Sequence, residues 1–123
     1  MISEKLEKAR AYEAENEKKI TPLMRPVFHL TPRVGWMNDP NGFSYYNGKY
    51  HMFYQYYPYR PFWGPMHWGH AVSEDLLHWN YLPTALAPDE PYENGGGCFS
   101  GSAIDLSDGR QLLVYTGVLS EKQ

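Results

Sequence analysis

The sequence lacks the features that mark several large classes of protein. Its single cysteine, Cys98, excludes an internal disulfide and, without a second cysteine, a zinc-finger framework. No stretch approaches the ~20 apolar residues of a membrane-spanning helix, and residues 2–19 alternate acids and bases instead of forming the apolar run of a signal peptide. The formal net charge of −3 argues against nucleic acid or an anionic membrane as a partner. We therefore expect a cytoplasmic protein that binds neither nucleic acid nor membrane.

Aromatic residues, by contrast, are abundant. They make up 16% of the 123 residues, with eleven tyrosines and four tryptophans, and they cluster between Trp36 and Tyr81. Such density suits β-strands. It also suits a sugar-binding surface, where ring faces stack on the C–H groups of a pyranose or furanose. The length allows one small domain or part of a larger one.

The chain is predicted to consist of two segments. Residues 1–20 form a helical extension, because Ser3 can cap a helix and two glutamates, Glu4 and Glu15, lie four residues before lysines. Its thin apolar stripe suits packing against a larger body, and its alternating charges are expected to face solvent. Thr21-Pro22 ends the helix, and the prolines that follow predict an extended lead-in. Residues 21–123 form the second segment, a β domain.

The β domain is predicted to contain short antiparallel strands. Asn47-Gly48 favours a type I′ hairpin turn between strands at residues 43–46 and 49–56. Further strands are expected, in chain order, at residues 67–73, 78–82, 99–104 and 111–116. A loop rich in Pro, Gly and acidic residues lies between the strands at residues 78–82 and 99–104. Its carboxylates, Glu93 included, are expected to be solvated.

The fold class is therefore all-β. The first four strands have the content of one propeller blade, and the last two begin a second blade. A blade cannot bury both of its faces alone, so about one and a half blades would leave an open strand edge. This favours the N-terminal fragment of a propeller over a small sandwich.

Residues 36–42 (Trp-Met-Asn-Asp-Pro-Asn-Gly) are the most distinctive stretch. Asp-Pro and Asn-Gly are turn signals, because Pro fixes φ and Gly tolerates positive φ. A turn here holds the Asp39 carboxylate on a rigid bend. Since many aspartates in turns do no more than cap the turn, this stretch alone leaves both a structural and a chemical role open.

Three further clusters combine aromatic rings with short polar groups, at residues 53–58, 62–71 and 98–102. A sugar needs that combination, because rings stack on its apolar face and polar groups bind its hydroxyls. The second cluster contains His67 and His70, but side chains three apart on a strand point to opposite faces. With no third ligand at suitable spacing, we predict no metal site. Cys98 is expected to be a small buried residue.

Four of these motifs together resemble glycoside hydrolase family 32, which contains invertases, sucrose-6-phosphate hydrolases, levanases and inulinases. They are residues 36–42, Phe-Tyr-Gln-Tyr at 53–56, His-Trp-Gly-His-Ala at 67–71 and Phe-Ser-Gly-Ser at 99–102. The resemblance runs from about Phe28 to the last residue. It implies a five-bladed β-propeller, of which this chain supplies about the first one and a half blades. It also implies a β-fructofuranosidase that hydrolyses sucrose or sucrose 6-phosphate with retention and without a cofactor.

The same resemblance implies roles for individual residues. Asp39 matches the nucleophile, which must stay ionised, so we expect it to accept hydrogen bonds from turn amides. Gln55 and Ser100 match positions that hydrogen-bond the fructosyl unit, whereas Trp63 and Phe99 match its apolar walls. Ordinary blade packing is the alternative for Trp63. The full implied substrate-binding set is Trp36, Met37, Asn38, Asp39, Gln55, Trp63, Phe99 and Ser100.

One part of the family pattern is missing from the sequence. Retaining chemistry needs a second carboxyl group about 5 Å from the first. The family supplies this acid/base from a Glu-Cys motif and a transition-state-stabilising aspartate from an Arg-Asp-Pro motif, and neither occurs in the 123 residues. We expect both downstream and therefore expect the chain alone to be inactive. The alternatives are a truncated non-catalytic fragment and a lectin-like carbohydrate-binding module. The leaving group and the oligomeric state stay open.

Overall fold

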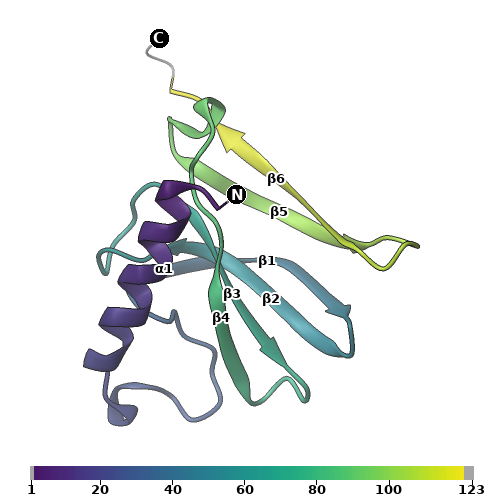
Figure 1. Ribbon diagram of the computed structural model, residues 1–123. Helices are drawn as coiled ribbons and strands as arrows, with labels where there is room; N and C mark the ends of the chain where they lie inside the picture. The colour runs from purple at the N-terminus through teal and green to yellow at the C-terminus, as the bar shows by residue number, and fades with distance from the viewer. Residues whose placement is uncertain (1, 121–123) are drawn as a thin grey trace.

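Two antiparallel sheets and one helix make up most of the computed structural model, which describes residues 2–120 (Figure 1). The main elements are α1 (Glu4–Asn16), β1 (Trp36–Tyr46), β2 (Lys49–Tyr57), β3 (His67–Ser73), β4 (Trp79–Leu86), β5 (Gly97–Asp105) and β6 (Gln111–Val118). Three short 3₁₀ helices lie between them, η1 (Glu17–Lys19), η2 (Pro22–Met24) and η3 (Pro91–Glu93). The predicted all-β fold with a short N-terminal helix is confirmed.

The first four strands form one sheet in the order β1-β2-β3-β4, and β5 pairs with β6 in a second sheet. Each strand in the first sheet is antiparallel to the next one in the chain, as expected for a blade. The two sheets are joined by main-chain bonds, because Met66 N donates to Gly96 O at 2.8 Å and Cys98 N donates to Met66 O at 2.9 Å. This junction sets β5 beside β1 (Figure 1).

The predicted hairpin turn is confirmed. Asn47 and Gly48 have φ values of 50° and 80°, which is the pair of positive φ angles that a type I′ turn requires. The last four strands also form, but several are longer than predicted. In particular, β4 continues through Pro83 to Leu86. A proline is tolerated there because β4 lies at the edge of its sheet, where one row of N–H groups has no partner strand.

The turn predicted at residues 36–42 is wrong, because β1 runs through the whole stretch. Trp36 and Met37 pair with Tyr57 and Tyr56 of β2, and this pairing overrides the local turn signals. The turn-forming residues instead produce two β-bulges, since the register shifts between Met37 and Pro40 and again between Asn41 and Ser44. Gly42 sits in the second bulge with φ of 51°.

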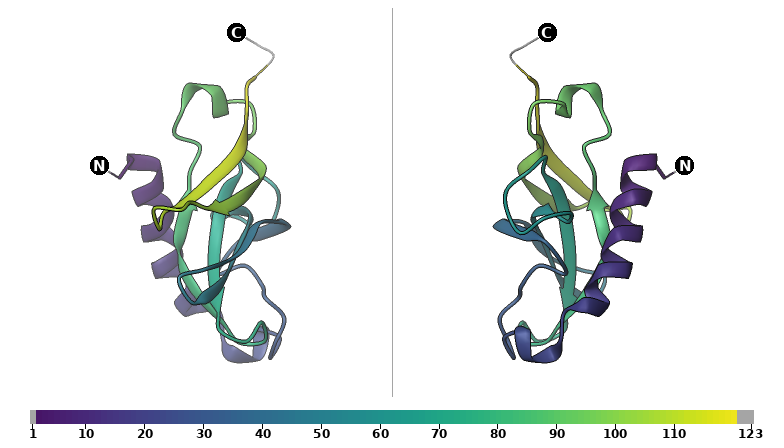
Figure 2. Two further views of the ribbon diagram at one scale, coloured as in Figure 1. Left: turned by 90° about the vertical axis from the view of Figure 1, so that its right-hand side faces the viewer. Right: turned by 90° about the vertical axis from the view of Figure 1, so that its left-hand side faces the viewer.

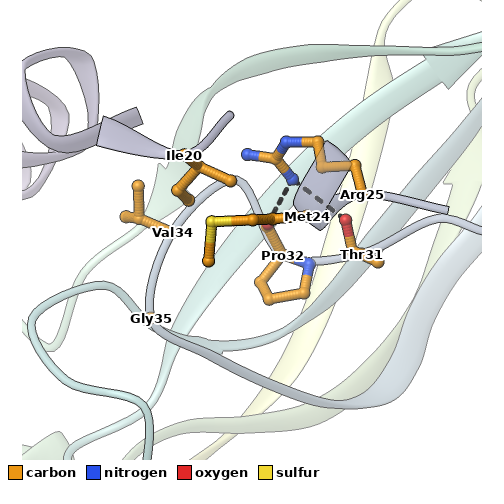
Figure 3. Close-up of a pocket in the computed structure, with 7 residues that line it drawn as sticks. All are labelled: Ile20, Met24, Arg25, Thr31, Pro32, Val34 and Gly35. Carbon is orange, nitrogen blue, oxygen red and sulfur yellow. Dashed lines mark hydrogen bonds between the residues drawn. The ribbon is translucent and has the colours of Figure 1, made fainter. Parts of the chain in front are cut away.

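The lead-in between α1 and β1 is held in place by Arg25. Its guanidinium donates to Thr31 Oγ1 at 2.9 Å, to Tyr81 Oη at 2.8 Å and to two main-chain carbonyls. The segment is less extended than predicted, because η2 interrupts it. Figure 3 shows the shallow pocket that the folded lead-in makes, lined by Ile20, Met24, Arg25, Thr31, Pro32, Val34 and Gly35. None of the predicted site residues lines it.

Helix α1 covers the outer edge strand β4, and both side views in Figure 2 place it along one side of the sheet. Ser3 caps it as predicted, accepting a hydrogen bond from Leu6 N at 3.1 Å. The prediction that its charges simply face solvent is wrong for Glu13, which is 1% exposed. Glu13 accepts hydrogen bonds from Thr84 N and Oγ1 in β4 and from Arg33 Nη1 at 2.8 Å. Glu13, Arg33 and Thr84 together form a polar clasp that protects the edge of β4.

The alternation of side chains along β2 divides the core into two clusters. Tyr54 and Tyr56 pack with Val34 on the side that α1 and the lead-in cover. Phe53 packs with Trp68 of β3 and Cys98 of β5 on the side that faces the second sheet. Neighbouring residues of β2 therefore serve different contacts. Phe53 packs toward β5, whereas Tyr54 packs toward the helix and the lead-in.

The connection between the sheets contains a second buried carboxylate. Glu93 is 2% exposed, so the expectation that it is solvated is wrong. It accepts hydrogen bonds from Tyr115 Oη and Glu90 N, and Cys98 Sγ lies 3.4 Å from it. Cys98 is fully buried, as predicted, and burial together with the nearby Glu93 raises the pKa of its thiol. The thiol therefore stays protonated, in keeping with a packing role.

Replacing Arg33 with alanine is expected to lower the free energy of unfolding by about 3 kcal/mol, because Glu13 is then left buried without its cationic partner. Urea unfolding of both proteins measures the difference. The matched control is Arg110→Ala, which removes an exposed ion pair with Asp108 and should leave the urea midpoint almost unchanged. Equal shifts for the two variants would contradict a stabilising clasp at Glu13.

Candidate active site

The Asp39 carboxylate lies where the two sheets meet. It is exposed, and it belongs to the first bulge of β1, where Asn38 and Asp39 together lie opposite Gln55 of β2. Ser100 lies in a bulge of β5, because Phe99 pairs with Thr116 and Gly101 with Tyr115, which leaves Ser100 as the extra residue. Bulges often re-aim side chains beside active sites. Here each one turns a polar side chain toward the other sheet.

Asp39 and Ser100 are in contact, since Ser100 Oγ donates a hydrogen bond to Asp39 Oδ2 at 3.3 Å. The sequence predicted turn amides as the donors to Asp39. In the described part of the chain the donor is instead a hydroxyl from the neighbouring sheet. The carboxylate is therefore oriented by packing between sheets and not by a local turn.

The residues just before Asp39 separate into two groups. Trp36 Nε1 donates to Asn38 Oδ1 at 2.9 Å, so these two polar groups are linked at the start of β1. Met37 lies between them in sequence but packs against the core cluster around Tyr54 and Tyr56. Trp36 and Asn38 are therefore joined to each other just before Asp39, whereas Met37 packs beneath the strand.

An aromatic pair lies next to Ser100. Trp63, in the connection between β2 and β3, is 51% exposed and makes an edge-to-face contact with Phe99, with ring centroids 6.5 Å apart. Several other large apolar side chains are exposed to a similar degree, and an exposed ring face is also suited to stacking on a sugar. Gly64 follows Trp63 and lies directly against the ring of Tyr57, where a Cβ atom would be 2.5 Å from the nearest ring carbon.

A buried polar network supports the site from below. Gln55 is 2% exposed, and its Nε2 donates to Cys98 O at 3.1 Å. Trp68 Nε1 donates to Phe99 O at 3.1 Å. Asn41, with its amide oriented to suit its neighbours, accepts from Gln55 Nε2 at 2.9 Å and from Trp68 Nε1 at 3.3 Å. The sequence predicts a turn at Asn41 and places Trp68 in the motif at residues 67–71, but neither signal predicts that the two side chains support the site.

The two histidines of the third motif do not come together. His67 Nδ1 lies 2.8 Å from Pro65 O, whereas His70 Nε2 lies 2.9 Å from His51 Nδ1. Over residues 2–120, no group of three or more His, Cys, Asp or Glu side chains is arranged to hold a metal ion. Within the same range, no helix has both the length and the apolar character needed to cross a bilayer.

A four-stranded meander and a second sheet set beside its first strand are the first part of a β-propeller. Residues 29–123 match the sequence model of the glycosyl hydrolases family 32 N-terminal domain. The chain therefore belongs to glycosyl hydrolase family 32, and the predicted resemblance is confirmed.

Relatives and solved structures agree with this assignment. A sucrose-6-phosphate hydrolase of Zymomonas mobilis is 60% identical over 92 residues, which cover 75% of this chain and 18% of that protein. A levanase of Bacillus subtilis is 62% identical over 80 residues, which cover 65% of this chain and 11% of the levanase. The structure of sucrose-6-phosphate hydrolase from Lactobacillus gasseri matches with a TM-score of 0.75 at 41% identity, over 99% of this chain and 23% of that one. The chain thus spans less than a fifth of the length of these curated relatives.

Gly64→Ala is expected to destabilise the protein by about 1–3 kcal/mol, because the new methyl group overlaps the Tyr57 ring behind Trp63. Thermal and urea unfolding measure the loss. Tyr57→Leu removes the obstructing ring, so the double variant should lose clearly less than the sum of the two single variants. Strict additivity would show that the contact between Gly64 and Tyr57 does not hold the Trp63 segment in place.

Proposed function

We propose that the protein hydrolyses the fructosyl glycosidic bond of sucrose or sucrose 6-phosphate with retention of configuration, using Asp39 as the nucleophile. The observation that supports this most directly is the contact between Asp39 and Ser100 beside the exposed Trp63–Phe99 pair. Family membership supports the reaction class. The name of the Zymomonas mobilis relative, a sucrose-6-phosphate hydrolase, supports the substrate.

The geometry of Asp39 suits nucleophilic attack. Ser100 donates to Oδ2, so Oδ1 is the oxygen available to attack the anomeric carbon of the fructosyl unit. As the new C–O bond forms, the bond to the leaving oxygen breaks and a general acid protonates that oxygen. Water then attacks the fructosyl-enzyme, the same group takes up a proton from the water, and Asp39 is released. Two displacements at one carbon return the original anomeric configuration.

The general acid and base must be a second carboxyl group about 5 Å from Asp39. The 123 residues contain no Glu-Cys and no Arg-Asp-Pro sequence. We infer that both carboxylates of these motifs are supplied from outside this sequence, by further blades of a propeller with five blades in all. The small share of each relative that the chain covers supports this division of the site.

The remaining predicted residues are assigned places around a bound fructosyl unit as follows. Trp63 and Phe99 supply the apolar wall, while Asn38 and Trp36 supply hydrogen-bonding groups at the rim. Gln55 acts from the face of the first sheet that is turned toward β5, whereas Met37 packs on the opposite face, which the helix covers, and supports the strand from there. We propose the site as a sugar site without a cofactor. The charged sequence over residues 2–19 supports a cytoplasmic location.

The leaving group is not decided by this part of the protein. A sucrose-6-phosphate hydrolase and a levanase are 60% and 62% identical to overlapping parts of the chain, yet their names imply different leaving groups. The shared segment is therefore expected to recognise the fructosyl unit. The group on the other side of the bond is then selected by residues elsewhere.

Asp39→Asn is expected to lower kcat for sucrose and sucrose 6-phosphate by at least about 10³-fold, since the amide is a poor nucleophile. Ser100→Ala should lower kcat/KM by about tenfold, as expected for one hydrogen bond to the reacting carboxylate. The measurement is release of fructose by the complete gene product. Asp105→Asn, at an exposed aspartate of the same strand as Ser100, is the matched control and should keep full activity. Undiminished turnover by Asp39→Asn would remove Asp39 from this role.

The stereochemistry separates the proposed mechanism from its alternatives. Proton NMR during turnover should show fructose released first with the anomeric configuration of the substrate, and inverted product would exclude a covalent intermediate on Asp39. Mass spectrometry of a quenched reaction should find a fructosyl adduct on the peptide that contains Asp39. Sugar binding without adduct or turnover in the complete gene product would instead indicate a lectin-like module.

A further inference from the structure

A second pocket lies away from the Asp39–Ser100 contact. Its volume is about 310 Å³, at the lower end of the range for small-molecule sites. Helix α1, the connection between β2 and β3 and the segment after β4 form its walls. Its lining residues are Lys5, Lys8, Tyr57, Tyr59, Pro65, His67 and Pro88.

His67 gives this pocket a buried hydrogen-bond acceptor. The side chain is 3% exposed, and its Nδ1 lies 2.8 Å from Pro65 O. Because a carbonyl can only accept, the proton of the neutral ring is on Nδ1, which leaves Nε2 as an acceptor. Burial lowers the pKa of His67 to about 4, so the ring stays neutral near neutral pH. The described part of the chain offers Nε2 no donor.

Two tyrosine rings flank this acceptor. Tyr59 stands nearly perpendicular to His67, with ring centroids 5.8 Å apart, and makes a similar edge contact with Tyr57 at 5.5 Å. Rings in this arrangement offer an apolar wall to the C–H face of a ligand. Tyr57 is also the ring that packs against Gly64, so the pocket lies directly behind the segment that presents Trp63.

Two ammonium groups stand at the pocket, and no carboxylate is among its lining residues. Lys5 donates to Pro88 O, and Lys8 Nζ lies 5.8 Å from the centroid of the Tyr59 ring. Lysines three residues apart lie on the same side of a helix, so both can reach one anion. Asp89 lies beyond the lining, near enough to His67 to raise its pKa by more than Lys5 lowers it.

We propose that this pocket binds a phosphorylated monosaccharide. The phosphate contacts the ammonium groups of Lys5 and Lys8, a sugar hydroxyl donates to His67 Nε2, and the C–H face of the ring packs on Tyr57 and Tyr59. The acceptor and the rings favour a sugar over a bare anion, and the lysines favour a charged sugar over a neutral one. The proposal does not depend on the role of Asp39.

The test is a calorimetric titration of the complete gene product with glucose 6-phosphate, glucose and inorganic phosphate. Glucose 6-phosphate is expected to bind at least about tenfold more tightly than either of the others, because only it uses both halves of the pocket. Its affinity should fall as salt is added. In a ¹⁵N-labelled sample, the Nε2 signal of His67 should shift on binding while Nδ1 keeps its proton.

Lys8→Gln should weaken binding of glucose 6-phosphate by about fivefold without altering the fold, since Lys8 is exposed. The matched control is Lys18→Gln, which makes the same charge change about 15 Å further along the helical segment and should leave the affinity unchanged. Equal affinity for phosphate and glucose 6-phosphate would reduce the pocket to a site for an adventitious anion. A silent His67 signal, or equal effects of the two variants, would also overturn the proposal.

Discussion

The junction between the two sheets determines where the site can form. Met66 exchanges main-chain hydrogen bonds with Gly96 and Cys98, and the amide of Gln55 holds the Cys98 carbonyl from beneath. These bonds fix the position of β5 relative to the first sheet, with β5 beside β1. A slip of one residue would turn Ser100 to the other face of its sheet and break its contact with Asp39. The contact between Asp39 and Ser100 therefore depends on backbone bonds made by other residues.

The bulges in β1 and β5 determine where the polar side chains of the candidate site point. A regular strand would point neighbouring side chains alternately up and down, which would separate Asn38 from Asp39. The extra residue in each strand relaxes that alternation, so that β1 and β5 each direct a polar group toward the gap between the sheets. Turn-forming residues within β1 are thus used to distort a strand and not to end it.

Local signals predicted much of the fold, because strands, the hairpin turn and the helix cap depend on residues close in sequence. The turn at residues 36–42 failed because pairing with β2 is stronger than the preference of Asp-Pro or Asn-Gly. The burial of Glu13 and Glu93 could not be predicted, since their partners Thr84 and Tyr115 lie 71 and 22 residues away. The candidate site residues were predicted from the resemblance of four motifs to glycoside hydrolase family 32. The contact between Asp39 and Ser100, and the support from Asn41 and Trp68, needed the structure.

The polar clasp at Glu13 also has a consequence for the order of assembly during translation. Helix α1 leaves the ribosome before β4, and Thr84, which completes the contacts of Glu13, is synthesised 71 residues after it. Until then Glu13 lacks the two Thr84 donors that accompany its burial, and burying a carboxylate without its hydrogen bonds is costly. The last strand of the first blade, β4, thus completes the surface on which the helix packs. In a nascent chain, α1 can therefore cover the edge of the sheet only after that blade has been synthesised.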